Sequence, residues 1–391
     1  MKDSLKIYQI VLLFLLFWSQ HAWFTWFVES NKIIEYFVYI LIFVVFFVYK
    51  SQYKITIRLT NKSIIAIALF SLGLLLSMDT IKAIPLVLIK YLPFIILSCD
   101  DKNSENHLRI ISMVLGWTVI IGLIPYLIWL LDTWRLPYTL LKFGEYEDFY
   151  NYYLFIVPSL SFTGFRYQSV FLEPGHLGTL CAFFLYINDY NLKKIYNVFF
   201  LIALIFSLSL AGYVLSILGY FFFLWTNNKH FIIPLLFTGM LFVAFTVVQQ
   251  INDGDNEINM MIIDRLQYDD EKGISGNDRF DYAVDKLYEQ SIQNGDIWFG
   301  IGGEEFNRRD LDGSGYKMFI LHHGIVAYLF IWLFYWFAAF NHVDRKRAVL
   351  LCVMLYLSFL KTTEPVTYFW LVTFYLYLNT HKIDRRLIRN Y

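Results

Sequence analysis

Charged residues are scarce in this chain. Asp, Glu, Lys and Arg make up 16% of its 391 residues, whereas a soluble domain normally carries about 25%. Acidic and basic residues are equally numerous, at 32 each, so the net charge is zero. A neutral chain has no long-range attraction for highly charged partners. The composition argues against an ordinary soluble protein and predicts no nucleic-acid partner.

Cysteine pairs and barrel patterns are also missing. The three cysteines, Cys99, Cys181 and Cys352, lie far apart, which excludes a disulfide framework and the paired spacing of a structural zinc site. The chain lacks the alternating segments of about ten residues that mark a transmembrane barrel. No small-residue cleavage site follows the first apolar run, so we expect a retained span and not a signal peptide.

Long apolar runs are the main feature that is present. Hydrophobic residues make up 58% of the chain, and runs long enough to cross a bilayer recur from end to end. The sequence therefore predicts an all-α, polytopic membrane protein with a single transmembrane domain over residues 1–391. We expect about twelve spans, at 7–28, 33–49, 63–78, 84–99, 109–131, 175–190, 196–211, 213–226, 231–249, 317–340, 348–361 and 364–380, with a very tight hairpin at 210–213.

Basic residues in the short connections predict the orientation. Lys and Arg cluster in the loops 50–62, 189–195 and 341–347 and in the C-terminal tail. An even number of predicted spans separates each cluster from the next, so all four fall on one side. Positive charge marks the cytoplasmic side. Both termini are then cytoplasmic, and the two long polar loops, 132–174 and 250–316, lie on the outer face.

The second outer loop concentrates the acidic charge of the chain. Residues 250–316 contain 16 of the 32 carboxylates and only six basic residues. A loop of this length is too long for a simple connector and is typical of functional or disordered segments. Because charge beside lipid is costly, its concentration in one loop points to a function there.

Three polar residues gather where the first outer loop meets the next span. Arg166, Glu173 and His176 lie within eleven residues, and Pro174 suits the first turn of the following helix. Glu173 would then lie at the positive end of the helix dipole, where a carboxylate is favoured. The alternative is purely structural, with Glu173 as a helix cap and Arg166 as an interfacial anchor.

A short amphipathic helix is predicted in the second outer loop, near 278–290. Its apolar positions are Phe280, Ala283, Val284 and Leu287, with Asn277 or Asp278 as the cap. Arg279 would lie in the first turn, where free backbone N–H groups favour a bound anion. The alternative is a charged face that only contacts solvent.

The rest of this loop adds glycines, arginines and an acid before the next span. Gly300, Gly302 and Gly303 form a turn that resembles a phosphate loop but lacks its Lys-Ser/Thr pair. Arg308, Arg309 and Asp312 follow. His322 and His323 are adjacent in the next span, so we expect their rings to point in different directions and to share no metal.

Together these segments resemble the O-antigen polymerase and O-antigen ligase family of bacterial envelope enzymes, which includes the Wzy-type polymerases. The resemblance covers about 160–335. It consists of Arg166 followed by Phe171, Glu173 and Pro174; of the Ser-rich element at 207–212; and of Asp278-Arg279, Phe299-Gly300-Ile301-Gly302 and His323-Gly324-Ile325, in that order.

The resemblance implies a membrane-embedded glycosyltransferase of the bacterial cytoplasmic membrane. It would join repeat units carried on undecaprenyl diphosphate into O-antigen, capsular or exopolysaccharide, without a cofactor or a metal. Arg166, Arg279, Arg308 and Arg309 would hold the diphosphate, because arginine pairs two N–H donors with phosphate oxygens. A flippase and a chain-length regulator are the implied protein partners.

The catalytic base stays open at this point. Ligase-type relatives have a histidine about eleven residues before the Gly-Ile element, but Gly313 occupies that position here. The candidates are Asp312, Glu173 and His176, with Asp312 first by position. Two other functions are considered: a ligase that moves glycan to lipid A core, and a flippase or transporter for lipid-linked sugar. Charge that lies in the outer loops and not in the spans favours an enzyme.

The first prediction concerns the sidedness of the two long loops. Cysteines introduced at Tyr146 and Asn256 should react with a membrane-impermeant thiol reagent in intact cells or spheroplasts, because both positions lie in predicted outer loops. The unsubstituted protein measures the background from its three native cysteines. Labelling that appears only after the membranes are ruptured would show that the two loops face the cytoplasm, which is the opposite of the predicted orientation.

Overall fold

The computed structural model describes part of the chain, and this part divides into two compact units. The first unit comprises 1–19, 28–110 and 278–391, and the second comprises 20–27 and 111–277. Each unit is described separately below. The described residues are 22–24, seven positions between 37 and 51, 61–76, 104–131, 136–141, 149–152, 154–158, 166–227, 239, 268–269, 273–274, 282–309, 311, 315–342, 344–360, 370, 373–374 and 376–378.

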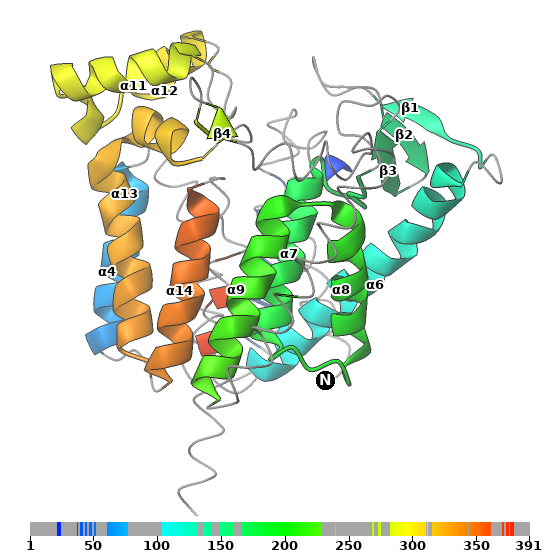
Figure 1. Ribbon diagram of the computed structural model, residues 1–391. Coiled ribbons are helices and arrows are strands. Elements are labelled where there is room, and N and C mark those ends of the chain that lie inside the picture. Colours follow the sequence, from blue (N-terminus) through cyan, green and yellow to red (C-terminus); the bar gives the residue numbers. More distant parts are fainter. Residues whose placement is uncertain are drawn as a thin grey trace, which may run out of the picture. The chain divides into compact units, whose positions relative to one another are not determined.

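Helices dominate both units (Figure 1). The second unit contains most of α6 (Ser104–Leu130), together with α7 (Pro174–Ile187), α8 (Ile195–Ser207) and α9 (Leu210–Thr226). The first unit contains α4 (Asn61–Leu76), α11 (Tyr282–Asn294), the 3-10 helix η6 (Asp296–Trp298), α12 (Gly303–Arg308), α13 (Tyr316–Phe340) and α14 (Arg345–Phe359).

These helices match seven of the predicted spans to within a few residues. Two of them, over Glu105–Leu130 and Tyr316–Phe340, are long and apolar enough to cross a membrane, and Ile64–Gly73, α7, α8 and α9 are shorter apolar helices. The predicted spans at 7–28, 33–49, 84–99, 231–249 and 364–380 lie wholly or mostly outside the described residues. The mostly helical fold is thus confirmed, while the count of twelve spans stays a prediction.

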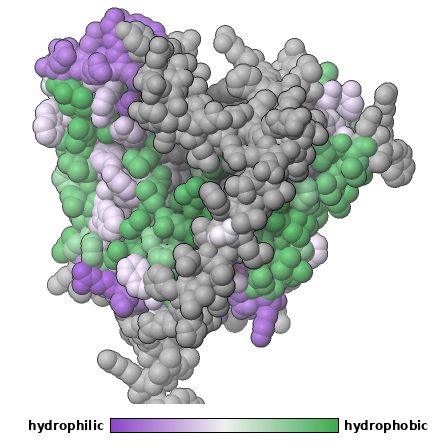
Figure 2. Space-filling model, in the orientation of Figure 1, coloured by the Kyte–Doolittle hydropathy of each residue, from purple (hydrophilic) through white to green (hydrophobic). Residues whose placement is uncertain are grey.

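The exposed face of α6 is apolar along its length. Met113, Trp117, Ile121 and Ile124 are exposed at intervals of three or four residues, which is the spacing of one helix face. The space-filling view shows hydrophobic residues covering this helix (Figure 2). Contiguous apolar surface of this kind marks contact with lipid or with another protein.

Residues 132–174, which were predicted as the first outer loop, contain strands. β1 (Thr139–Leu141), β2 (Phe149–Tyr152) and β3 (Phe155–Pro158) form an antiparallel sheet in which β2 is central. A second, two-stranded pair, β4 (Tyr268–Asp269) and β5 (Gly273–Ile274), lies in the other long loop. The all-α prediction is therefore wrong for these segments. Aromatic residues favour strands, and Tyr138 and Tyr150 indeed pack edge to face, with ring centroids 4.5 Å apart.

Two glycines allow α7 and α9 to approach each other closely. A Cβ atom added at Gly212 would lie 2.7 Å from the carbonyl carbon of Gly178, and one added at Gly178 would lie 2.8 Å from Ser209 Oγ. Small residues permit such backbone contact between helices in membranes. The turn before α9 is at Leu208 and Ser209, so the predicted hairpin at 210–213 is wrong by a few residues.

Serine side chains shape this turn. Leu208 adopts the left-handed conformation, with φ 45°. Ser209 caps α9, because its side chain accepts a hydrogen bond from Gly212 N at 3.2 Å. Ser207 Oγ donates to Leu204 O at 2.7 Å and accepts from Ser209 N at 3.3 Å. The Ser-rich element therefore satisfies backbone groups that two closely spaced helix ends would otherwise expose.

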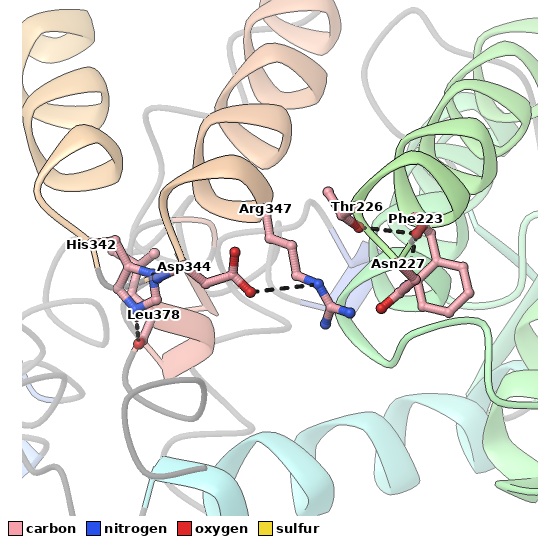
Figure 3. A network of polar contacts seen from close by, with 7 residues as sticks. All are labelled: Phe223, Thr226, Asn227, His342, Asp344, Arg347 and Leu378. Carbon is pink, nitrogen blue, oxygen red and sulfur yellow. Dashed lines mark hydrogen bonds and ion pairs between the residues drawn. The ribbon is translucent and has the colours of Figure 1, made fainter. Parts of the chain in front are cut away.

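Each unit also has polar contacts at a helix end, which Figure 3 shows at the C-terminal end of α9 and at the connection between α13 and α14. At the end of α9, Thr226 Oγ1 and Asn227 Nδ2 both donate to Phe223 O, at 2.9 and 2.8 Å. In the first unit, His342 Nδ1 accepts from Asp344 N at 3.0 Å, and its Nε2 contacts Leu378 O. Arg347 pairs with Asp344 at 3.7 Å. The basic residues Arg345, Lys346 and Arg347 thus form the first turn of α14.

The close approach of α7 and α9 predicts the effect of adding a methyl group. Gly212→Ala should lower the melting temperature of the detergent-solubilised protein, by an overpacking cost of about 1–3 kcal/mol. Gly239→Ala is the matched control, because this glycine is helical and a Cβ there meets nothing within 4 Å. The control should be neutral or slightly stabilising. Equal melting temperatures for the two variants would contradict the proposed helix contact.

Candidate functional site

In the second unit, residues 166–172 form a buried segment, called the strap below. Its backbone is held from three directions: Tyr167 N donates to Phe206 O, Ile156 N donates to Ser169 O and Trp23 N donates to Val170 O, each at 3.0 Å. Residues 22–24, β3 and the end of α8 therefore position the strap. The start of the strap is consequently held against the end of α8.

Arg166 is buried at the start of the strap, with only 9% of its surface exposed. Its Nε donates to Ser207 O at 3.3 Å. Burying a guanidinium is costly unless it is hydrogen-bonded, and the serine turn supplies an acceptor. An interfacial anchor would keep its charged head in water. The burial of Arg166 therefore argues against that alternative and indicates a guanidinium that the fold holds in a fixed position.

The next residues of the strap are fixed by the neighbouring helix. Tyr167 Oη donates to Val119 O of α6, and burial raises the pKa of Tyr167 well above its usual range. The phenol therefore stays neutral at any physiological pH. Ser169 has φ 58°, a left-handed conformation that is uncommon outside glycine and that clusters at functional sites.

Glu173 and His176 flank the start of α7. Pro174 occupies the first turn, as predicted, and Glu173 precedes it with extended backbone but without a side-chain capping bond. Its carboxylate lies 3.7 Å from His176 Nε2, with the Glu173 side chain 60% exposed and that of His176 13% exposed. The structure thus brings two of the three candidate bases together, as a carboxylate beside an imidazole.

In the first unit, α11 is the predicted amphipathic helix, shifted towards the C-terminus. Val284 and Leu287 pack with Met318 and Leu321 of α13. Ala283 is exposed, so its prediction as a core position is wrong. Asn277, Asp278, Arg279 and Phe280 lie outside the described residues, and the anion role of Arg279 stays a prediction.

An ion pair that sequence analysis missed ties α11 to α13. Lys317 Nζ lies 2.8 Å from Asp285 Oδ1 and 5.7 Å from the centroid of the Tyr288 ring. The two partners are 32 residues apart in the chain, so no local spacing indicates the pair. It orients α11 across the N-terminal end of α13 (Figure 1).

The glycine turn after η6 docks onto a break in α13. Gly324 interrupts this helix, with φ 85° and ψ 163°. Ile301 N donates to Leu321 O at 2.8 Å, which satisfies a carbonyl that the break releases. A Cβ at Gly300 would lie 2.8 Å from Gly324 N. The glycines of this turn are therefore explained by the close packing of its backbone on α13, and a bound phosphate is not needed to explain them.

The two adjacent histidines lie at the same break, and their arrangement differs from the prediction. Their rings stack, with centroids 3.8 Å apart and planes at 22°, so the expectation that they point in different directions is wrong. Regular helical spacing ends at Gly324, which removes the basis for that expectation. His322 also stacks on Phe306, with centroids 4.5 Å apart.

Arg308 and Arg309 both pair with one carboxylate. Arg308 is the last residue of α12 and Arg309 follows it, and both pair with Glu305, Arg309 through Nε at 2.7 Å. These hydrogen bonds lower the pKa of Glu305, first through Arg309 and then through Arg308. The pair is thus present at neutral pH and is lost as the pH falls through that lowered pKa. The predicted diphosphate role would require both arginines to leave Glu305.

Asp312 lies outside the described residues. Within the described ranges, no group of three His, Cys, Asp or Glu side chains is placed to hold a metal ion. No protein-family model, curated protein or solved structure matches the chain. The interpretation of function therefore depends on the residues themselves.

The docking of the glycine turn onto α13 predicts a graded mutational effect. Gly300 and Gly302 both have φ 78°, but a Cβ at Gly302 meets nothing within 4 Å, whereas one at Gly300 meets the backbone of His322 and Gly324. Gly302→Ala should lower the free energy of unfolding only by the strain of the left-handed conformation, on the order of 1 kcal/mol. Gly300→Ala should lower the melting temperature clearly more. The reverse order would contradict the docked turn.

Proposed function

We propose that this protein is a polysaccharide polymerase of the bacterial cytoplasmic membrane. It joins oligosaccharide repeat units carried on undecaprenyl diphosphate into O-antigen, capsular or exopolysaccharide. The single observation that supports this most is the buried Arg166, held by the serine turn at the start of a segment that resembles the family's arginine element. A cation fixed in apolar surroundings is suited to a lipid-borne phosphate.

The proposed membrane arrangement has about twelve spans, cytoplasmic termini and outer loops 132–174 and 250–316. Within the second unit, α7 runs from the strap to Lys193 and Lys194, and α8 returns to the serine turn. The strap and the basic connection thus lie at opposite ends of the same helices. Basic loops mark the cytoplasm, which assigns the strap to the outer half of the membrane.

Helix length indicates how deep the strap lies. The 14 residues of α7 extend about 21 Å at 1.5 Å per residue, whereas the hydrocarbon core is about 30 Å thick. If the basic connection lies at the cytoplasmic surface, the strap lies within the outer leaflet and not above it. A lipid-linked substrate reaches that depth by lateral diffusion, which favours a lipid diphosphate over a water-soluble nucleotide sugar.

The proposed reaction is a glycosyl transfer. The acceptor hydroxyl of one lipid-linked unit attacks the anomeric carbon of the other glycan, whose bond to the diphosphate oxygen breaks. Undecaprenyl diphosphate leaves with that bond's electron pair, and its charge is stabilised by Arg166 and, by resemblance, Arg279. A base accepts the hydroxyl proton. Asp312 is the candidate by sequence position, whereas the paired Glu173 and His176 are supported by their geometry.

The arginines provide the direct mutational test. Arg166→Ala and Arg279→Ala should each cut polymer formation about ten- to a hundredfold, which corresponds to one charge-assisted contact of roughly 1.5–3 kcal/mol. Arg→Lys should restore little activity, because lysine lacks the two-pronged donor geometry. Arg109→Ala is the control, since this exposed arginine bonds only Asn106 among the described residues. Full activity of both alanine variants, at equal protein levels, would refute the diphosphate assignment.

Deletion in the native host distinguishes the proposed function from its alternatives. A polymerase deletion should accumulate lipid-linked single repeat units that are exposed on the outer face. A ligase deletion would instead accumulate unattached polymer, and a flippase deletion would retain single units on the cytoplasmic face. The lipid-linked glycans can be resolved by size after extraction, with the complemented strain as the reference.

A further inference from the structure

Gln168 and Ser169 of the strap both have polar side-chain atoms that are buried without a hydrogen-bond partner among the described residues, and Gln168 has two such atoms. Only 1% of its surface is exposed. Neither its amide nitrogen nor its amide oxygen has a hydrogen-bond partner among the residues that the structure describes. Leaving such groups unpaired costs about 1–3 kcal/mol, so a glutamine at this position destabilises the unliganded protein.

The placement of Gln168 links it to Arg166. The side chain of Tyr167 reaches Val119 on α6, while that of Arg166 reaches Ser207 at the end of α8. Gln168 lies two residues after Arg166, so the Cα atoms of the two residues are no more than about 7 Å apart. The strap backbone is bonded to its neighbours at Tyr167, Ser169 and Val170, which fixes this spacing.

The chemistry of an amide selects its ligand. The amide nitrogen donates two hydrogen bonds and the amide oxygen accepts two. A diphosphate at neutral pH offers acceptors only and would leave the oxygen unpaired. Sugar hydroxyls and acetamido groups both donate and accept, so they can satisfy both ends of the side chain.

From these observations we propose that Gln168 binds the sugar attached to the lipid diphosphate and selects its identity. The assignment rests on the proposed function and deepens it. Arg166 holds the phosphate, and Gln168 forms hydrogen bonds with the hydroxyl or acetamido groups of the first sugar. The sugar must displace the side chains that cover Gln168, which is within the range of rotamer changes common on ligand binding. Stability lost in the free protein is recovered in the complex.

The test compares stability with activity in one variant. Gln168→Met keeps the length of the side chain and removes both polar groups. Its melting temperature should equal or exceed that of the wild type, because an orphaned polar group has been removed. Its kcat/KM for the lipid-linked repeat unit should fall tenfold or more, since a substrate hydroxyl then lacks its partner.

Thr373→Val is the matched control. Thr373 is fully buried, and its hydroxyl has no partner among the described residues, but it belongs to the other unit, away from the strap in sequence. This variant should gain stability and keep full activity. If Gln168→Met behaves in the same way, its amide is a structural orphan and the proposal is overturned.

A second measurement covers the case in which Gln168→Met does not fold. Wild-type protein is melted with undecaprenyl diphosphate alone and with the sugar-bearing lipid. The sugar-bearing lipid should raise the melting temperature more, and Gln168→Asn, which keeps an amide but shortens its reach, should abolish the difference. Equal shifts in the wild type would overturn the sugar contact. Failure of the proposed function itself is distinguishable, because the wild-type protein would then form no polymer from the lipid-linked repeat unit.

Discussion

The close approach of α7 and α9 is the constraint on which the candidate site depends. Gly178 and Gly212 bring the two backbones together, and this contact places the serine turn beside the strap. The carbonyl of Ser207 then accepts from Arg166. A larger residue at either glycine would move the turn and remove the acceptor. Burying a cation is costly unless it is hydrogen-bonded, and the close contact of the two helices supplies one acceptor for it.

The first unit uses glycine for a comparable purpose. Its glycine turn fills a break in α13, where Ile301 satisfies a released carbonyl and two histidine rings stack. Unpaired backbone in an apolar helix is tolerated where neighbouring groups of the protein satisfy it. The serine turn and the glycine turn thus share one feature: in each, backbone segments pack closely together next to polar side chains.

Local patterns predicted the helices well and the junctions poorly. Pro174 marked the start of α7, and Val284 and Leu287 marked the buried face of α11, because both signals act over a few residues. The strands near Tyr150 were missed because each is only three or four residues long, and residues 132–174 were predicted as a loop. The break at Gly324 and the Lys317–Asp285 pair depend on distant contacts that no local spacing encodes. Likewise, only the folded structure shows that Gln168 is buried and unpaired.

The central claim is that this chain alone extends a glycan from a lipid-diphosphate donor. The most direct measurement is polymerisation by the purified protein in liposomes that contain only the lipid-linked repeat unit of its host, without any nucleotide sugar. The account predicts a ladder of products spaced by one repeat unit, with release of one undecaprenyl diphosphate for each addition. A single unreacted band, from protein that is folded and correctly inserted, would contradict it.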